Sequence, residues 1–145
     1  MIMNYIGIDP GSNGAIACVG EEVKFINFKG AKLEQVSDFL ESNPGRVYIE
    51  RVHSMPGQGV VSSFTFGSNV GVIIGILACL KRPYTLVNPT SWMKSYGMTR
   101  DRGETKTQWK QRLVAKAKEL FPGAKITLAN ADALLIANYG KHAGE

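Results

Sequence analysis

The chain of 145 residues predicts an α/β fold, in which a five-stranded mixed sheet with an antiparallel meander is flanked by helices. Three short apolar runs near the N-terminus are separated by turn residues, which is typical of consecutive antiparallel strands. A helical repeat then precedes another apolar run, and this strand–helix–strand order predicts a parallel pair within the same sheet. The length and the 44% apolar content suit a single domain over residues 1–145.

The first third of the chain is predicted to form the meander and one helix. The strands are expected at Tyr5–Asp9, Ala15–Val19 and Val23–Phe28. The first strand is apolar up to its last residue, and Pro10-Gly11 then opens a turn into the second. The third alternates apolar and polar side chains, which is the period of a strand with one exposed face. Apolar residues at helical spacing over Ala31–Ser42 predict a helix across one face of the sheet.

The middle of the chain is predicted to add two strands and a long helix. The strands are expected at Arg46–Glu50 and Tyr84–Val87, and the helix at Ser62–Leu80. Glycines recur every fourth residue of this helix, at Gly67, Gly71 and Gly75, which leaves one face without side chains. Because a glycine costs about 1 kcal/mol in a helix interior, we expect this face to pack closely on the sheet or on a second subunit.

Three further helices complete the predicted fold. A short one begins at Pro89. The next follows Thr105 and Gln108, which are spaced as a capping box. The last covers Ala131–Tyr139, with Asn130 as its expected N-cap.

Positive charge is concentrated in one segment. Residues 81–118 carry six lysines and four arginines against Asp101 and Glu104, a net charge of +8, whereas the whole chain carries +5. Such a segment suggests a polyanionic partner such as nucleic acid, with a solvated helix face as the plainer alternative. The apolar run over residues 70–80 is too short to cross a membrane. The two cysteines stand in apolar runs, so we expect buried thiols and a cytoplasmic protein. We also expect no small-molecule cofactor.

Three carboxylates stand alone in apolar elements: Asp9 and Glu50 at strand ends, and Asp132 in the first turn of the last helix. The carboxyl ends of parallel strands meet at one sheet edge, so Asp9 and Glu50 should lie together. Isolated acids in such places need cations or hydrogen bonds, and carboxylate oxygens suit Mg²⁺. Each acid also has a plainer role. Asp9 suits a turn, Glu50 could pair with Arg46 or Arg51, and Asp132 suits a helix dipole.

Metal-binding acids beside a basic segment indicate metal-assisted phosphodiester chemistry. The chain resembles the RuvC-type Holliday-junction resolvases, of the small kind carried by bacteriophages, which have an RNase H-like fold. The resemblance covers nearly the whole chain. Its carriers are Gly7-Ile8-Asp9-Pro10-Gly11, Tyr48-Ile49-Glu50-Arg51-Val52, the helix segment Gly67–Gly75, Trp92-Met93-Lys94, Glu104-Thr105-Lys106 and Ala131-Asp132-Ala133-Leu134. The first motif alone also occurs in actin-like kinases, whereas the set in this order is specific.

The resemblance implies a homodimeric DNA endonuclease of recombination and repair. It implies that Asp9, Glu50 and Asp132 hold two Mg²⁺ ions, which Mn²⁺ can replace, and that hydrolysis leaves a 5′-phosphate and a 3′-hydroxyl. Lys94 and Lys106 match basic positions near the scissile phosphate and are the other expected catalytic residues. The expected DNA-contacting residues are Arg51, His53, Lys94, Arg100, Arg102, Lys106 and Lys110.

The last motif departs from the family pattern. The family has a fourth acid shortly before the position of Asp132, where this chain reads Leu128-Ala129-Asn130-Ala131. Three explanations stay open: three acids suffice, Asn130 supplies a weaker amide ligand, or the residue at 130 is a disabling substitution.

We therefore expect a structure-selective endonuclease that resolves four-way or other branched DNA by paired nicks in the cytoplasm of a bacterial host. The alternatives are a less selective branched-DNA nuclease and a junction-binding protein with weak or no catalysis.

Overall fold

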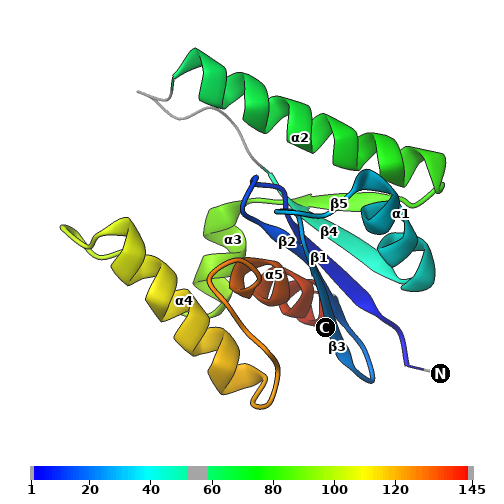
Figure 1. Cartoon of the computed structure of the whole chain (residues 1–145). Coiled ribbons are helices and arrows are strands. Elements are labelled where there is room, and N and C mark those ends of the chain that lie inside the picture. The colour runs from blue at the N-terminus through cyan, green and yellow to red at the C-terminus, as the bar shows by residue number, and fades with distance from the viewer. Residues whose placement is uncertain (1, 52–58, 144–145) are drawn as a thin grey trace.

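The computed structural model describes residues 2–51 and 59–143, and contains one five-stranded sheet in the order β3-β2-β1-β4-β5 (Figure 1). The strands are β1 (Tyr5–Asp9), β2 (Ala15–Val19), β3 (Val23–Asn27), β4 (Arg46–Glu50) and β5 (Tyr84–Val87). Pairing is antiparallel from β3 through β2 to β1, and parallel from β1 through β4 to β5. The predicted mixed sheet with its meander is confirmed.

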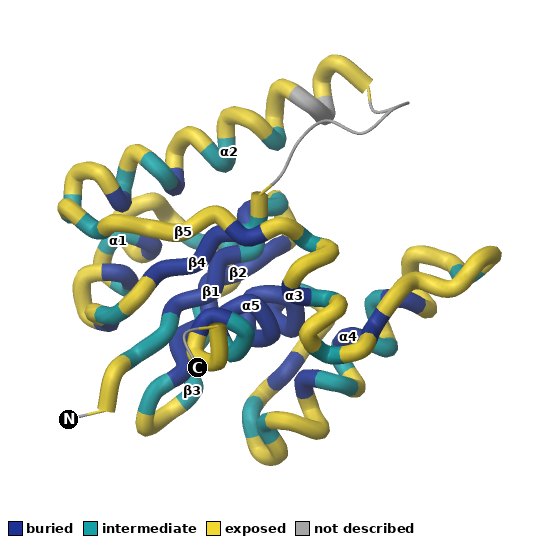
Figure 2. The backbone as a smooth tube through the Cα atoms, turned by 180° about the vertical axis from the view of Figure 1, so that it is seen from behind, coloured by how far each residue is buried: buried dark blue, intermediate teal, exposed yellow. Residues whose placement is uncertain are grey.

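Helices lie on both faces of the sheet. They are α1 (Leu33–Ser42), α2 (Val60–Cys79), α3 (Pro89–Ser95), α4 (Lys106–Leu120) and α5 (Ala131–His142). One face carries α1 and α2, and the other carries α3, α4 and α5 (Figure 1). Two buried clusters follow from this arrangement, one on each face, and the central strands and α5 hold most of the buried residues (Figure 2).

The closest contact between layers is that of β1 with α5. Side chains alternate along β1, so that Ile6 and Ile8 join the cluster under α1 and α2 while Gly7 faces α5. A Cβ atom at Gly7 would lie 2.1 Å from the carbonyl oxygen of Ala133 and 2.4 Å from the backbone nitrogen of Ala137. Glycine therefore allows the backbone of α5 to rest directly on β1.

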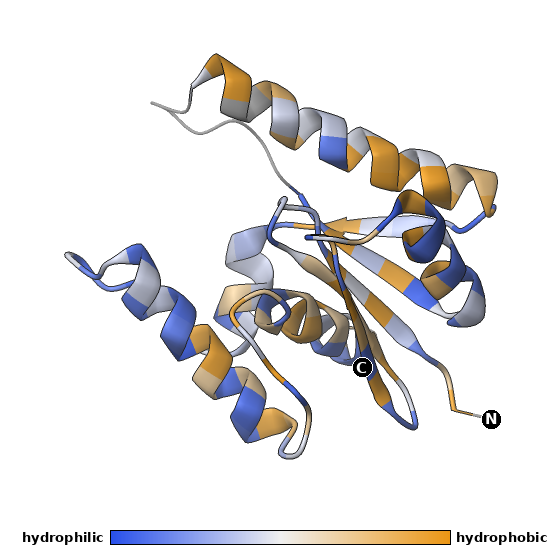
Figure 3. Ribbon diagram, viewed as in Figure 1, coloured by the Kyte–Doolittle hydropathy of each residue, from blue (hydrophilic) through white to orange (hydrophobic). Residues whose placement is uncertain are grey.

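Helix α2 is the least covered element. Its residues Ile73 and Leu77 are buried, but Val60 and Phe64 are 87% and 75% exposed. Figure 3 shows apolar colour along this helix, while much of α4 is hydrophilic. Side chains added at Gly67, Gly71 and Gly75 would meet nothing within 4 Å, so the expectation that this face packs on the sheet is wrong. No helix among the described residues is long and apolar enough to cross a membrane.

Candidate active site

Two acidic side chains end neighbouring parallel strands. The register pairs Ile8 of β1 with Ile49 of β4, so Asp9 and Glu50 follow at the same sheet edge. Asp9 stands two residues after Gly7, which faces α5, and Glu50 stands two residues after Tyr48, which packs in the cluster on that face. Since alternate residues of a strand share a face, both acids point to the side of the sheet that carries α5.

Asp132 brings a third carboxylate to the same place. It lies in the first turn of α5 and is 6% exposed. Its negative charge raises the pKa of both Asp9 and Glu50, which places the three groups within one electrostatic neighbourhood. The structure thus brings together the three acids that the sequence singles out.

Asp9 combines a turn contact with a half-buried position at the end of β1. Its Oδ1 accepts a hydrogen bond from the backbone N–H of Gly11 at 3.3 Å, as the turn-capping alternative expects. Burial, and then the charge of Asp132, raise the pKa of Asp9 to about 6. The cation of Lys110 and the Gly11 N–H oppose this rise. Asp9 is therefore a carboxyl group that lacks enough positive partners in the chain itself.

Glu50 is oriented by a tryptophan. The Nε1–H group of Trp92, a fully buried residue of α3, donates to Oε2 of Glu50 at 2.7 Å. Burial is the main cause that raises the pKa of Glu50 to about 7, followed by the charge of Asp9. Arg46 and Arg51, the plainer partners considered from sequence, are exposed. The Trp92 contact was not predicted, because the two residues lie 42 positions apart.

The two oxygens of Asp132 have different surroundings. Oδ2 lies 2.5 Å from Nζ of Lys110, a residue of α4 that the sequence suggested only as a DNA contact. Oδ1 is buried and has no hydrogen-bond partner among the described residues. An acceptor left unpaired in this way is destabilising, and a bound cation would satisfy it.

The donor set fits a hard divalent cation. Three carboxyl groups gather at one sheet edge, Asp132 buried and Asp9 and Glu50 half-buried, and among the described residues one ammonium group pairs with one of them. Within residues 2–51 and 59–143, no three His, Cys, Asp or Glu side chains stand close enough to enclose an ion by themselves. Mg²⁺ commonly binds one or two carboxylates and completes its shell with waters and substrate phosphate, so Asp9, Glu50 and Asp132 fit an open site of this kind.

Asn130 has a structural role in the preceding loop. It is buried and is the N-cap residue of α5, as predicted, but its side chain makes no capping hydrogen bond. Its Oδ1 accepts from the backbone N–H of Thr127 at 2.8 Å, and its Nδ2 donates to the carbonyl oxygen of Lys125 at 3.1 Å. These bonds hold the loop that leads into Asp132.

The other predicted basic residues lie on the surface. Exposed positions are found for Arg51, Lys94, Arg100, Arg102 and Lys106, whereas His53 lies outside the described residues. The loop that carries the two arginines is fastened to α4. Nη1 of Arg112 donates to Oε1 of Glu104 at 3.0 Å, and that oxygen also accepts from the backbone N–H of Asp101 at 2.9 Å.

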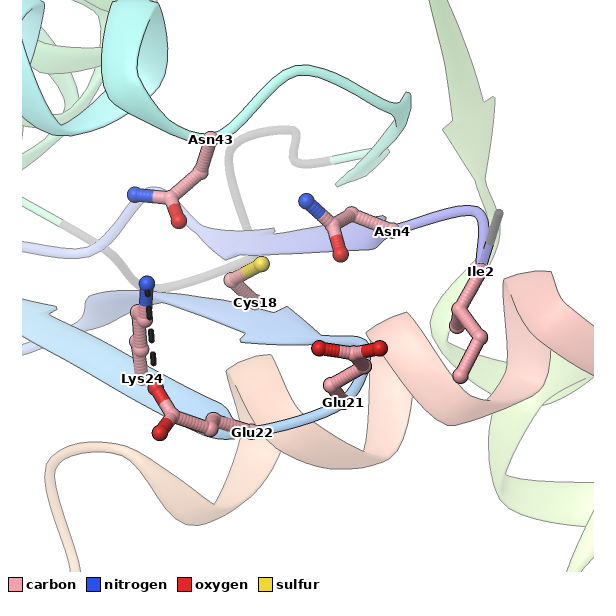
Figure 4. A pocket seen from close by; sticks show the side chains of 7 residues that line it. All are labelled: Ile2, Asn4, Cys18, Glu21, Glu22, Lys24 and Asn43. Atoms are coloured by element: carbon pink, nitrogen blue, oxygen red, sulfur yellow. Dashed lines mark ion pairs between the residues drawn. The ribbon is translucent and has the colours of Figure 1, made fainter.

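A polar cavity lies away from the three acids. A cavity of about 310 Å³ is lined by residues that include Asn4, Cys18, Glu21 and Glu22 (Figure 4). Asn4 precedes β1, so this cavity stands at the opposite end of that strand from Asp9.

Cys18 is buried as expected, but Cys79 is exposed, so the prediction of a buried thiol is wrong for Cys79.

Comparison with known proteins gives a structural likeness only. No protein-family model and no curated protein sequence matches the chain. The fold is similar to that of Thermus thermophilus RuvC in complex with a Holliday junction substrate, with a TM-score of 0.64, 14% identity, and coverage of 97% of this chain and 96% of that one. A second Thermus thermophilus RuvC structure gives a TM-score of 0.61 at 14% identity, covering 99% of this chain and 97% of the other.

Proposed function

We propose that residues 1–145 form one nuclease domain, a metal-dependent endonuclease that resolves four-way or other branched DNA by paired nicks. The observation that carries the proposal is the convergence of Asp9, Glu50 and Asp132 at one sheet edge. The shared fold supports it, because one of the similar RuvC structures holds a Holliday junction substrate. The motif resemblance extends the proposal to the small bacteriophage kind, acting in the cytoplasm of a bacterial host.

Asp9, Glu50 and Asp132 would hold the metal, which we propose to be two Mg²⁺ ions, with Mn²⁺ as a substitute. Such ions supply Lewis acidity at the phosphate and lower the pKa of water. The chain contributes the positioning. Trp92 orients Glu50 from a buried place in α3, and the bonds of Asn130 to its loop fix the approach to Asp132. Asp9 and Glu50, whose pKa values are raised to about 6 and about 7, must lose their protons before they bind a cation, which favours neutral to alkaline pH.

Exposed cations would position the DNA. The proposed phosphate contacts come from the end of β4, from α3, from the loop before α4 and from the start of that helix, and they are Arg51, Lys94, Arg100, Arg102 and Lys106. The hydrogen bonds of Glu104 with Arg112 and Asp101 support this, because they fix the loop in advance and lower the entropy lost on binding. Lys94 and Lys106 are proposed nearest the scissile phosphate, and His53 near the bases of the crossover.

A specific contact also favours the second candidate, a junction-binding protein with little catalysis. The ammonium group of Lys110 forms an ion pair with Oδ2 of Asp132. The amide oxygen of Asn130, the suggested substitute for a fourth acid, accepts a hydrogen bond from the backbone N–H of Thr127 in its own loop. Both contacts lower the number of free oxygen ligands at the site. The two candidates share the DNA surface and differ only in the metal step.

A cleavage assay on a four-way junction with Mg²⁺ and with Mn²⁺ separates the candidates. We expect paired nicks by the unaltered chain, and loss of cleavage with retained junction binding in Asp9→Asn and in Glu50→Gln. Each change keeps the shape of the side chain but removes a negative ligand. The matched control is Glu21→Gln, an exposed residue beyond the opposite end of β1, which should cut normally.

Normal Mg²⁺-dependent cleavage by either site variant would show that the assigned site is wrong. Binding of the junction without cleavage in both metals, by the unaltered chain, would instead select the junction-binding protein.

A further inference from the structure

Lys110 stands at the border between the interior and the solvent. On α4, Trp109, Leu113 and Ala117 are buried against the body of the protein, and Lys110 follows directly after the first of them. The side chain of Lys110 is 30% exposed, its Nζ lies 2.5 Å from Oδ2 of Asp132, and the side chain of Asp132 is 9% exposed. The ammonium therefore contacts the acidic site while part of the lysine side chain remains open to solvent.

The contact serves the whole acidic group as well as Asp132. Burial lowers the pKa of Lys110, but the charge and hydrogen bond of Asp132 and the charges of Asp9 and Glu50 together outweigh it and raise the pKa overall. In return, Lys110 lowers the pKa of Asp9 and of Glu50. One positive charge thus offsets part of the repulsion among three neighbouring carboxyl groups, which is the electrostatic task of a bound cation.

We propose that Lys110 is the internal counter-cation of the metal-free site, and that a divalent ion binding to Asp132 displaces its ammonium group. The inference rests on the proposed metal site. The ion would bind at the unpaired Oδ1, on the same carboxylate that holds the ammonium at Oδ2, and the repulsion between these two neighbouring cations drives the singly charged ammonium away. Lysine suits this exchange, because its four-carbon stem turns easily and its side chain is already partly exposed. The released ammonium then faces solvent near the basic surface, where it becomes available to a DNA phosphate.

The test is a titration of the protein with Mn²⁺ alone. Binding is measured by calorimetry or by the electron paramagnetic resonance signal of free Mn²⁺. Lys110→Met should bind Mn²⁺ about tenfold more tightly than the unaltered chain, because no ion pair has to break and a repelling charge is gone. The control is Lys118→Met, an exposed lysine of the same helix, which changes the net charge equally and should leave the affinity unchanged. Without metal, Lys110→Met should melt at a lower temperature, and Mn²⁺ should raise its melting temperature more than that of the unaltered chain.

A second variant keeps the inference testable if Lys110→Met folds poorly. Lys110→Gln retains a hydrogen-bond donor toward Asp132 and loses only the charge, so it should also bind Mn²⁺ more tightly. Equal or weaker Mn²⁺ affinity in the folded variants, beside normal junction cleavage by the unaltered chain, would overturn the role of Lys110 and leave the proposed function standing. Tighter Mn²⁺ binding without any junction cleavage would support Lys110 and remove the nuclease. Absence of Mn²⁺ binding in all variants would overturn both.

Discussion

Glu50 is the residue whose acid–base chemistry depends most directly on the folded structure. Its partner Trp92 is fully buried and lies 42 positions along the chain, so this hydrogen bond exists only in the folded protein. Burial raises the pKa of Glu50 from 4.5 to about 7. A folded state that holds a proton more tightly than the unfolded chain is favoured at low pH, and this advantage disappears as the pH rises through the folded pKa.

The stability of the metal-free chain should therefore depend on Glu50 from its ordinary pKa of 4.5 up to the folded value of about 7. Glu50→Gln resembles the protonated acid and should match the unaltered chain near pH 4, below the unfolded pKa. It should be more stable near pH 8, by up to about 3 kcal/mol for a shift of this size. Thermal or urea unfolding with a chelator present measures the difference. Glu21→Gln, a change at an exposed acid, should show no such trend. The same difference at both pH values would mean that Glu50 is well solvated when charged.

The three acids could be found from sequence, but their partners could not. Asp9, Glu50 and Asp132 are the only acids in short apolar elements, and strand order alone brings two of them to one edge. The contacts of Trp92 with Glu50 and of Lys110 with Asp132 depend on how α3 and α4 pack over the sheet. The way helices pack is not encoded in any local sequence pattern. The sequence around Trp92 and around Lys110 therefore gave no indication of their contacts with Glu50 and Asp132.

Among the elements, β1 and α5 form the pair that fixes the site. Asp9 ends the first and Asp132 begins the second, so their separation depends on how closely the two backbones approach at Gly7. Strand ends were predicted well, because turn residues such as Pro10-Gly11 and Asn88-Pro89 bound them. The position of α2 was not predictable in the same way. A helix that is apolar on most sides gives no amphipathic direction by which to orient it.

A methyl group at Gly7 should separate β1 from α5. Gly7→Ala would place a Cβ 2.1 Å from a backbone oxygen, and neither backbone can yield locally. We expect a loss of stability of about 1–3 kcal/mol or more, as for other overpacked cores, together with weaker Mn²⁺ binding as Asp132 moves away. Urea unfolding and a Mn²⁺ titration measure the two effects. Gly59→Ala, where a Cβ meets nothing within 4 Å, is the control and should change neither. An unaffected Gly7→Ala would show that the two elements have room to adjust.

At the scale of the whole molecule, the uncovered side of α2 is the feature that most needs a partner. Val60 and Phe64 expose apolar side chains on this helix. Gly67, Gly71 and Gly75 form its glycine face, where an added Cβ would meet nothing within 4 Å. Exposed apolar patches of this kind are typical of subunit interfaces, and a two-fold dimer would place two copies of the proposed nuclease site on a symmetric junction. The glycine pattern already suggested a second subunit from sequence. The structure removes the competing explanation, in which the sheet covers that face.

Light scattering should give a mass of about twice 15.8 kDa. Phe64→Glu introduces a charge into the proposed interface at a side chain that is 75% exposed, so it should produce a folded monomer. Leu128→Glu changes a side chain that is 55% exposed in the loop before α5, and should remain dimeric. A monomer at tens of micromolar for the unaltered chain, or a dimer that tolerates Phe64→Glu, would contradict the interface and with it the paired nicks.

The late position of α5 in the chain also bears on biosynthesis. A ribosome releases the meander β1–β2–β3 first, and these strands pair through short turns that close quickly. The covering of β1 waits for residues beyond 130, because Gly7 receives the backbone of α5 rather than a side chain from nearby. A nascent chain consequently holds Asp9 and Glu50 long before it holds Asp132. The proposed metal site would therefore stay incomplete, and the proposed nuclease inactive, until Asp132 has left the ribosome and α5 has packed on β1.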